Sequence, residues 1–340
     1  MRAVQLVRWQ AEPELREIDE PEPGPGEVLV RVEGAGLCHS DLHVMEFPEG
    51  TLPWQLPFTL GHENAGSVAE LGAGVRGLEV GDPVLIYGPW GCGTCRQCVR
   101  GAENLCVRAG ELPGRGCGLG FDGGLAEYVV VPSARLLVRI DGLDPSHVAP
   151  LGDAALTPYS AIKAELWRLT PGSQVVVIGA GGLGQVAVQI LSALTAARIL
   201  VADPREASRD RALDAGAAVA VASGEDLAGE LGREGAACVF DFVGVQETVD
   251  LAASLLATGG HASIVGVGGG TFPLAFGKVP LGASASRPTW GSLPELHEVV
   301  ALARAGSITL DVEELTLDDA VEGYRRLHDG AIAGRAVVVP

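Results

Sequence analysis

The sequence predicts an α/β protein of two domains, one rich in β-strands and one built on a doubly wound parallel sheet. The chain has 340 residues, which is long for a single hydrophobic core. Residues 1–150 contain short apolar runs separated by glycine and proline, whereas apolar strands alternate with amphipathic helices from residue 151 onward. The end of the chain returns to a mixed pattern. We therefore expect one domain of residues 1–150 and 291–340, with residues 151–290 inserted as the other.

The individual elements follow from these patterns. In the first domain, apolar runs bounded by glycine or proline predict strands at 27–32, 82–86 and 136–140. A further strand at 336–339 is expected to complete this domain. In the second domain, continuous apolar runs predict buried parallel strands at 175–178, 199–202, 218–221, 238–240 and 263–265. Helices are predicted between them, at 185–194 and 206–215.

Composition and charge exclude several classes of protein. The chain is 47% hydrophobic and 20% charged, which is typical of a folded globular protein. Its net charge of -19 and the lack of a basic cluster argue against binding to nucleic acid. The N-terminus lacks the apolar core of a signal peptide, and no apolar run is long enough to span a membrane. We therefore expect a cytoplasmic protein that acts on small molecules.

A glycine-rich motif at 179–184 predicts a dinucleotide-binding site. It follows the strand at 175–178 and precedes a helix, as the Gly-x-Gly-x-x-Gly fingerprint requires. Gly179 permits the tight turn, Gly181 lets the backbone approach a pyrophosphate, and Gly184 allows the helix to pack closely on the strand. The amides at the helix N-terminus then bind the phosphates. A purely structural glycine turn is the alternative.

The cofactor preference depends on two residues that follow the next strand. Asp203 lies at the end of the strand at 199–202, where its carboxylate can accept hydrogen bonds from the ribose hydroxyls. The same negative charge repels the 2′-phosphate of NADP, so the sequence favours NAD. Arg205 is close enough to accommodate that phosphate, which leaves NADP open.

Four of the seven cysteines are crowded into a lobe at about 90–108. The lobe is polar and glycine-rich, and its cysteines are Cys92, Cys95, Cys98 and Cys106. Four thiolates bind zinc tetrahedrally and leave no open coordination position, so such a site is structural. Two disulfides or free thiols are the alternative, which a cytoplasmic location disfavours.

Cys38 and His62 are the next candidates for metal binding. Cys38 follows a predicted strand, and His62 lies in a Gly-His-Glu tripeptide further along the chain. Taken alone this pair is weak, because a lone cysteine after a strand more often serves packing than chemistry.

Three motifs together, however, resemble those of the zinc-containing medium-chain alcohol dehydrogenases. They are the Gly-His-Glu-x-x-Gly signature that begins at Gly61, the cysteine quartet, and the Gly-Gly-x-Ala-Glu-Tyr segment at 123–128. The resemblance covers essentially the whole chain, and within the family the chain looks most like the secondary-alcohol dehydrogenases of the shorter bacterial branch. It implies a GroES-like catalytic domain plus a Rossmann domain, NAD, two zinc ions per subunit, and a homotetramer.

The resemblance also implies a catalytic zinc with three protein ligands. Cys38 and His62 match two ligand positions of the family. The third is commonly a cysteine, but here the matching residue is Asp153, and zinc also accepts carboxylate oxygen. Glu63 matches the family's acidic neighbour of the metal. For Asp153 the alternative is an ordinary helix cap, because it precedes an Ala-Ala-Leu segment at a helix start.

The implied reaction is the reversible NAD-linked oxidation of alcohols, secondary ones above all, to ketones or aldehydes. Zinc would lower the pKa of the bound alcohol, so that an alkoxide forms and transfers hydride to the nicotinamide. Ser40 matches the family's first proton-relay hydroxyl, and His43 matches the position that receives the proton through the ribose. By family position, the substrate pocket is expected to contain Ser40, Trp54, Leu119 and Trp290.

Cofactor contacts are expected at several further family positions. Val265 and Val267 would offer backbone groups to the nicotinamide carboxamide, and Arg335 would reach the cofactor phosphates. His39 is either a phosphate contact or a surface residue. The full expected set is His39, Gly179, Gly181, Gly182, Leu183, Gly184, Asp203, Arg205, Val243, Val265, Val267 and Arg335.

Three other functions compete with this interpretation. A zinc-free reductase of the same superfamily would lack the Cys38 and His62 pair. A polyol dehydrogenase resembles this family but normally lacks the histidine found at position 43. A non-catalytic NAD-binding sensor would need neither metal ligands nor relay residues, both of which are present here.

Overall fold

The computed structural model describes residues 1–340, which divide into two compact units. The first unit contains Met1–Asp153, Ser292–Arg304 and Leu310–Pro340, and the second contains Ala154–Gly291 and Ala305–Thr309. The boundary after Asp153 lies three residues beyond the expected one, and it groups Asp153 with the β-rich unit. No helix of the chain is long and apolar enough to cross a bilayer.

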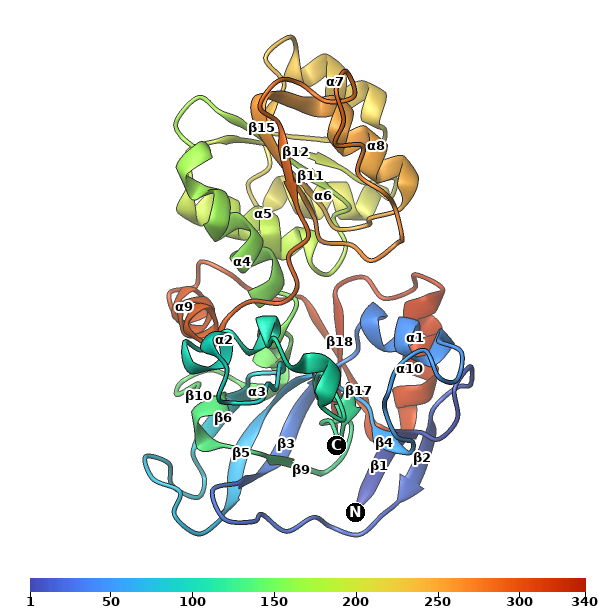
Figure 1. Ribbon diagram of the computed structural model, residues 1–340, viewed down its shortest axis with the longest axis vertical. Helices are drawn as coiled ribbons and strands as arrows, with labels where there is room; N and C mark the ends of the chain where they lie inside the picture. Colours follow the sequence, from blue (N-terminus) through green and yellow to red (C-terminus); the bar gives the residue numbers. More distant parts are fainter. The chain divides into compact units, whose positions relative to one another are not determined.

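The first unit is built on a seven-stranded, largely antiparallel sheet that combines both ends of the chain (Figure 1). The strand order is β10-β6-β5-β3-β18-β17, and β9 also pairs with β3. In chain order the strands are β3 (Val28–Gly36), β5 (Glu63–Leu71), β6 (Pro83–Ile86), β9 (Tyr128–Val131), β10 (Leu137–Arg139), β17 (Val312–Thr316) and β18 (Arg335–Val339). The expected C-terminal strand is therefore present, and it lies beside β3.

Smaller elements complete the first unit. A three-stranded sheet has the order β2-β1-β4, and a two-stranded sheet pairs β7 with β8. These strands are β1 (Arg2–Leu6), β2 (Glu14–Glu17), β4 (Phe58–Thr59), β7 (Gly116–Cys117) and β8 (Gly120–Phe121). The helices are α1 (His39–Glu46), α2 (Arg96–Val99), α3 (Pro145–Val148), α9 (Leu293–Arg304) and α10 (Ala320–His328).

The pairing of β3 with β5 brings two candidate site segments together. Gly36, at the end of β3, lies opposite Glu63, the first residue of β5. A Cβ atom at Gly36 would lie 2.1 Å from Glu63 Oε2, so only glycine leaves room for that carboxylate. Cys38 lies two residues after β3 and is the N-cap of α1, while His62 immediately precedes β5. The sheet register therefore places Cys38 and His62 at the same end of the two strands.

The second unit is a six-stranded parallel sheet with the order β13-β12-β11-β14-β15-β16. The strands are β11 (Gln174–Ile178), β12 (Arg198–Ala202), β13 (Val219–Val221), β14 (Ala236–Asp241), β15 (Leu256–Ile264) and β16 (Ser284–Ser286). The strand expected at 263–265 is thus only the last part of β15. The sequence did not predict the edge strand β16, because its Ser-Ala-Ser segment has no apolar run.

Helices cover both faces of this parallel sheet (Figure 1). They are α4 (Leu156–Glu165), α5 (Gly184–Leu194), α6 (Glu206–Asp214), α7 (Gly224–Leu231) and α8 (Gln246–Leu255). Apolar side chains of α7 and α8 pack against alternate residues of the strands, such as Val176 and Ile178 of β11. Both faces of the strands are buried, which explains why they are continuous apolar runs rather than alternating ones.

Candidate active site

Four buried side chains of the first unit form a compact group, the mixed cluster, made of Cys38, His62, Glu63 and Asp153. Each offers one donor atom, and these atoms all lie within 4.8 Å of one another. Asp153 comes from the short 3-10 turn Ala149–Gly152, which ends at this residue. The structure thus brings together the three expected ligands and the expected acidic neighbour.

The geometry of the mixed cluster fits a zinc ion. Cys38 Sγ and His62 Nε2 lie 3.7 Å and 3.5 Å from Asp153 Oδ2. Tetrahedral zinc with bonds of about 2.0–2.3 Å separates its donor atoms by about 3.3–3.8 Å. One sulfur, one nitrogen and one oxygen donor are also a ligand set that zinc accepts, and three protein donors leave one position for a small molecule.

The structure does not support the alternative in which Asp153 caps a helix. Helix α4 begins at Leu156, its N-cap is Ala155, and no side chain caps it. The Asp153 carboxylate instead lies beside Cys38 Sγ and His62 Nε2. Its role as a ligand is taken up as a proposal below.

Glu63 is a fully buried carboxyl group next to the candidate ligands. Its Oε2 atom is paired with the Arg335 guanidinium, whereas Oε1 is buried without a hydrogen-bond partner. Burial raises the pKa of Glu63 to about 7, although the Arg335 charge opposes this shift. A buried acceptor that lacks a donor is unusual, and a cation at the mixed cluster would satisfy it.

The Arg335 side chain lies elsewhere than the sequence led us to expect. We expected its side chain to reach cofactor phosphates, but its guanidinium is buried, pairs with Glu63 and donates to Leu37 O at 3.2 Å. The reason is that β18 lies against β3, so its first residue faces the mixed cluster. A phosphate contact by Arg335 stays a prediction that these contacts do not favour.

Sequence reasoning missed Asp41, which lies on α1 and is fully buried. Its Oδ1 atom is 2.9 Å from His62 Nδ1, and its Oδ2 atom accepts from Cys38 N at 3.3 Å and from the Tyr324 hydroxyl at 2.8 Å. Although burial opposes the charged form, Asp41, Asp153 and Cys38 raise the pKa of His62 well above its ordinary value. The spacing of Asp41 three residues after Cys38 was the available signal, whereas nothing in the sequence linked Tyr324 to it.

The expected proton-relay residues lie on the first turns of α1. Ser40 Oγ is 3.7 Å from Cys38 Sγ, so the hydroxyl lies next to a candidate metal ligand. The His43 side chain is 44% exposed, and its Nδ1 atom lies 4.0 Å from Glu46 Oε2. His39 is exposed. These positions allow Ser40 to contact a candidate metal ligand, and they leave His43 accessible to solvent.

The expected pocket residues fall in both units. Trp54 packs edge-to-face on Phe58, with 6.0 Å between ring centroids, and a Cβ atom at Gly120 would lie 2.8 Å from the Trp54 ring. Trp54 therefore packs against the loop that carries the buried Leu119. Trp290 belongs to the second unit and has a φ of 48°, a conformation that bulky residues rarely adopt outside functional sites.

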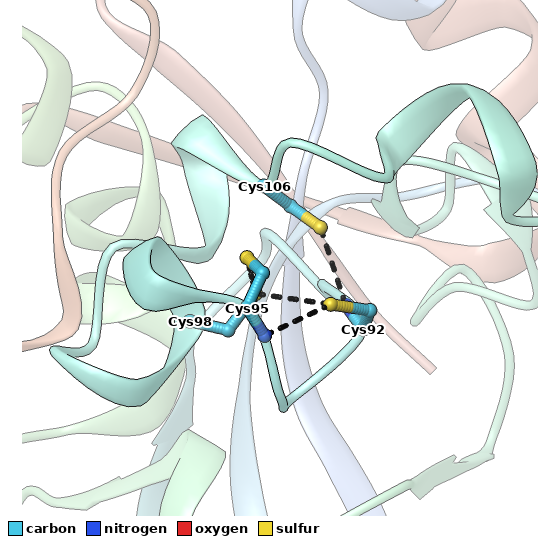
Figure 2. A group of neighbouring side chains, drawn as sticks. All are labelled: Cys92, Cys95, Cys98 and Cys106. Atoms are coloured by element: carbon cyan, nitrogen blue, oxygen red, sulfur yellow. Dashed lines mark hydrogen bonds between the residues drawn. The ribbon is translucent and has the colours of Figure 1, made fainter.

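The cysteine quartet, Cys92, Cys95, Cys98 and Cys106, forms a second compact group in the first unit (Figure 2). Its sulfur atoms lie within 4.8 Å of one another, with 3.5 Å between Cys95 and Cys98 and 4.0 Å between Cys92 and Cys98. No disulfide links any of the seven cysteines of the chain, so the structure does not support the disulfide alternative. Four sulfurs at these separations fit a closed tetrahedral zinc site.

Backbone amides of the lobe point at the cysteine quartet. Cys95 N donates to Cys92 Sγ at 3.3 Å, and Cys92 N donates to Cys106 Sγ at 3.4 Å. Hydrogen bonds from the backbone of Thr94 and Cys95 lower the pKa of Cys92 to about 6, whereas burial raises the pKa of Cys98 to about 12. The lobe is therefore folded so that thiolates are stabilised at its exposed side.

The glycine motif of the second unit has the geometry expected of a dinucleotide loop. Gly179 has a φ of 83°, and a Cβ atom at Gly184 would lie 1.9 Å from Gly179 O. Both positions therefore require glycine, for the turn and for the close helix–strand contact. The side-chain position of Gly181 is open except for the Arg205 guanidinium 3.5 Å away, so its backbone is accessible. Gly182 and Leu183 complete the turn before α5.

Asp203 is buried at the end of β12, and its carboxylate is already hydrogen-bonded. Oδ2 accepts from Ala180 N at 2.8 Å, and Arg205 donates to both oxygens through Nε and NH2, each at 3.0 Å. Burial raises the pKa of Asp203, but Arg205 and the backbone amides outweigh burial and lower it overall. Of the other expected contacts, Val265 is buried and Val243 and Val267 are exposed.

Comparisons with known proteins identify the family. Residues 24–142 match the alcohol dehydrogenase GroES-like domain, and residues 182–304 match the zinc-binding dehydrogenase domain. The chain is 35% identical to D-arabinose 1-dehydrogenase (NADP+) of Saccharolobus solfataricus, covering 100% of this chain and 97% of that one. It is 34% identical to NAD-dependent alcohol dehydrogenase of Sulfurisphaera tokodaii, covering 100% of both. This chain belongs to the zinc-containing medium-chain alcohol dehydrogenase family.

A solved structure agrees with this assignment. The alcohol dehydrogenase of Aeropyrum pernix has a TM-score of 0.90 and 34% sequence identity to this dehydrogenase, with 100% of each chain covered. The predicted fold class, a GroES-like domain plus a Rossmann domain, is confirmed. The prediction that the chain is an alcohol dehydrogenase is likewise confirmed.

Proposed function

We propose that this dehydrogenase interconverts secondary alcohols and ketones with NAD, using a catalytic zinc at Cys38, His62 and Asp153 and a structural zinc at the cysteine quartet. The observation that carries the proposal is the mixed cluster. Its sulfur, nitrogen and oxygen donors are buried, and the distances between them are those expected of donors around one zinc ion. The dinucleotide loop of the second unit supports a nicotinamide cofactor. Bound zinc would supply a Lewis acid toward the substrate oxygen, and bound NAD would supply a hydride acceptor.

The side chains around the proposed catalytic zinc have distinct roles. One thiolate, one carboxylate and a neutral imidazole neutralise a dication, and Asp41 orients the imidazole through His62 Nδ1. Ser40, whose hydroxyl lies 3.7 Å from Cys38 Sγ, would take the first proton from the substrate. His43 would pass it to solvent, because its side chain is 44% exposed. Glu63 would stay paired with Arg335 and act as an acidic neighbour of the metal.

The preference for NAD would depend on the balance between Asp203 and Arg205. A ribose would have to replace Arg205 on the Asp203 carboxylate, while a 2′-phosphate would have to pair with the released guanidinium against the repulsion of Asp203. Charge-assisted hydrogen bonds contribute roughly 1.5–3 kcal/mol, so Asp203→Ser should reduce selectivity for NAD at least about tenfold. Arg205→Ala should weaken NADP binding and should not weaken NAD binding, because it leaves the Asp203 carboxylate free for the ribose. Unchanged NAD/NADP ratios in Asp203→Ser would refute the assignment.

Polyols or sugars are the alternative substrates, because one relative at 35% identity is named D-arabinose 1-dehydrogenase. Of the expected pocket residues, Trp54 and Leu119 favour apolar alcohols, since only the indole NH and the Ser40 hydroxyl of the first unit could hydrogen-bond substrate hydroxyls. A panel of secondary alcohols, polyols and aldoses, assayed with NAD and with NADP, decides between them. The proposal expects higher kcat/KM for apolar secondary alcohols, and loss of all turnover after chelation. Higher kcat/KM for aldoses would establish the alternative.

A homotetramer in the cytoplasm completes the proposal. The edge strand β16 has one unpaired side, and Leu274, Phe276 and Leu281 are exposed in the segment before it, with Phe276 fully so. Exposed strand edges flanked by apolar side chains are typical of subunit contacts. Seven free cysteines suit a reducing compartment. Sedimentation equilibrium should give about four times the chain mass of 35.0 kDa, and Phe276→Asp should lower it.

A further inference from the structure

Asp41 is a buried carboxylate that contacts two residues of the mixed cluster, Cys38 and His62. Its Oδ1 atom bonds His62 Nδ1, and its Oδ2 atom accepts from the Cys38 backbone amide. The side chain is fully buried, and the one buried guanidinium of the chain, that of Arg335, is paired with Glu63. No lysine or arginine is paired with Asp41. Apart from His62, its carboxylate is therefore stabilised by hydrogen-bond donors, and its direction depends on where those donors lie.

The remaining donor to Asp41 is Tyr324, which lies far along the chain on α10. Its hydroxyl is 2.8 Å from Asp41 Oδ2, and its side chain is almost completely buried. Burial and the Asp41 charge keep the pKa of Tyr324 well above its ordinary value, so the phenol is a donor. The phenol reaches no donor atom of the mixed cluster by hydrogen bond, so any effect on a bound metal would pass through Asp41.

The residue before Tyr324 explains how α10 comes close enough. A Cβ atom at Gly323 would lie 2.7 Å from a side-chain carbon of Leu37, the residue that precedes Cys38. A larger residue at 323 would meet the ends of the Leu37 and Leu315 side chains, which would have to shift to make room for it. Helix α10 is thus packed closely against this segment, and it also contacts α1.

We propose that Tyr324 is a positioning residue for the metal of the mixed cluster, and that it acts by fixing the carboxylate of Asp41 against His62 Nδ1. The inference rests on the proposed function, because it assumes that the mixed cluster binds a metal. Three donors from three directions hold Asp41 in one orientation, and Asp41 in turn sets the ring plane and tautomer of His62. Without the phenol, Oδ2 keeps only the 3.3 Å bond from Cys38 N, and the carboxylate can rotate away from His62.

The expected effect is on metal affinity. Removing a residue that orients a metal ligand typically weakens binding about 10–100-fold. Asp41→Ala removes the orienting carboxylate itself, so its loss of metal affinity should lie near the upper end of this range. Tyr324→Phe removes one hydroxyl that acts through Asp41, so its loss of metal affinity should lie near the lower end of this range, at about tenfold. In the Asp41→Ala background the same Tyr324→Phe change should have almost no further effect, because the group it positions is gone.

The test measures binding of Co²⁺ rather than turnover. Mild chelation empties the mixed cluster while the quartet zinc is retained, and Co²⁺ is then titrated while its visible d–d absorption is recorded. The proteins are wild type, Tyr324→Phe, Asp41→Ala and the double variant. Tyr87→Phe is the matched control, because it also removes a buried phenol hydroxyl, one that is bonded to the backbone of Asn104 instead. Quartet zinc content, measured by elemental analysis, reports whether each variant is folded.

The inference expects about tenfold weaker Co²⁺ binding and an altered d–d spectrum in Tyr324→Phe, with wild-type behaviour in Tyr87→Phe. Wild-type affinity and spectrum in Tyr324→Phe would overturn it. An equal loss with and without Asp41 would also overturn it, because Tyr324 would then act by another route. If wild type itself takes up no Co²⁺ at the mixed cluster, the proposed catalytic zinc fails first, and the role of Tyr324 fails with it.

Discussion

The cysteine quartet and the mixed cluster lie in the same unit, yet the chain builds them in opposite ways. The quartet comes from one segment, 92–106, and all its donors are sulfur. The mixed cluster combines sulfur, nitrogen and oxygen, and two of its donors, Cys38 and Asp153, are 115 residues apart. A local site is specified by spacing alone. A distributed site exists only after the sheet has formed, so its stability and its chemistry are linked to the fold.

The two sites also differ in the groups that surround their donors. Around the quartet, backbone amides of Cys92 and Cys95 bond the sulfur atoms. Around the mixed cluster, the partners are side chains from distant elements, namely Asp41 and Arg335. Backbone donors stabilise thiolates and close the site, whereas charged side chains can tune a ligand that must also take part in a reaction. This contrast supports the proposed structural role of the quartet and the proposed catalytic role of the mixed cluster.

The largest effect is expected from Asp153, because it decides whether the mixed cluster has three ligands or two. Asp153→Asn weakens an anionic oxygen donor, while Asp153→Cys replaces it with a thiolate. The Asn variant should lose the zinc of this site and reduce kcat/KM by about a hundredfold to a thousandfold, because Lewis-acid stabilisation of several kcal/mol is lost. The Cys variant should keep its zinc. Elemental analysis and steady-state kinetics measure both.

Asp144→Asn is the matched control for this pair. Asp144 is a true N-cap, since its side chain accepts from Ser146 N, and asparagine caps a helix as well as aspartate does. The control should therefore keep full activity and zinc content. Full activity and metal content in Asp153→Asn as well would show that Asp153 is not a ligand.

A smaller and different effect is expected from breaking the cysteine quartet. Cys106→Ser removes one of four sulfur donors, so the lobe should lose its zinc and the free energy of unfolding should fall by roughly 2 kcal/mol or more. The mixed cluster should keep its metal, because its donors lie outside the lobe. Differential scanning calorimetry and metal analysis of the same sample test this. A variant that unfolds like wild type but has lost activity would reverse the roles assigned to the two sites.

The smallest effect is a difference in thiol reactivity within the metal-free lobe. The pKa of Cys92 is lowered to about 6, so above that pH it is mostly thiolate, whereas the pKa of Cys98 is raised to about 12 and it stays a thiol at neutral pH. Cys117 and Cys238 also have pKa values raised to about 12 by burial. Alkylation of the chelated protein at pH 7, mapped by mass spectrometry, should label Cys92 first. Preferential labelling of Cys98 would contradict this difference in pKa between the two thiols.

The sequence predicted the second unit and the quartet well, because both depend on local patterns. The strand–turn–helix order around Gly179 can be recognised from the spacing of apolar residues and from the positions of the glycines. Four cysteines that are close in sequence can be recognised as a metal site without knowledge of the fold. The strand β16 was missed because a Ser-Ala-Ser segment at a sheet edge carries no apolar signal. Residue preferences do not reveal a strand that is held in place by hydrogen bonds alone.

The surroundings of the mixed cluster were predicted less completely. Its ligands were predicted only through family resemblance, since no spacing rule joins Cys38 to Asp153. Asp41 was missed, and its burial becomes apparent only when α10 brings Tyr324 against it. Arg335 was expected at the cofactor, but the pairing of β18 with β3 directs it to Glu63. Long-range contacts of this kind follow from the fold rather than from any short pattern.

Stepwise chelation, with metal content, activity and thermal unfolding followed in one sample, tests the central contrast most directly. The closed quartet should release its zinc slowly, whereas the mixed cluster, which keeps an open coordination position, should release its zinc first. The expected result is that activity disappears as the first equivalent leaves, that the unfolding transition stays unchanged, and that it shifts only when the second equivalent leaves. Fully active enzyme with at most one zinc per chain, or a first loss that lowers stability and spares activity, would contradict the account.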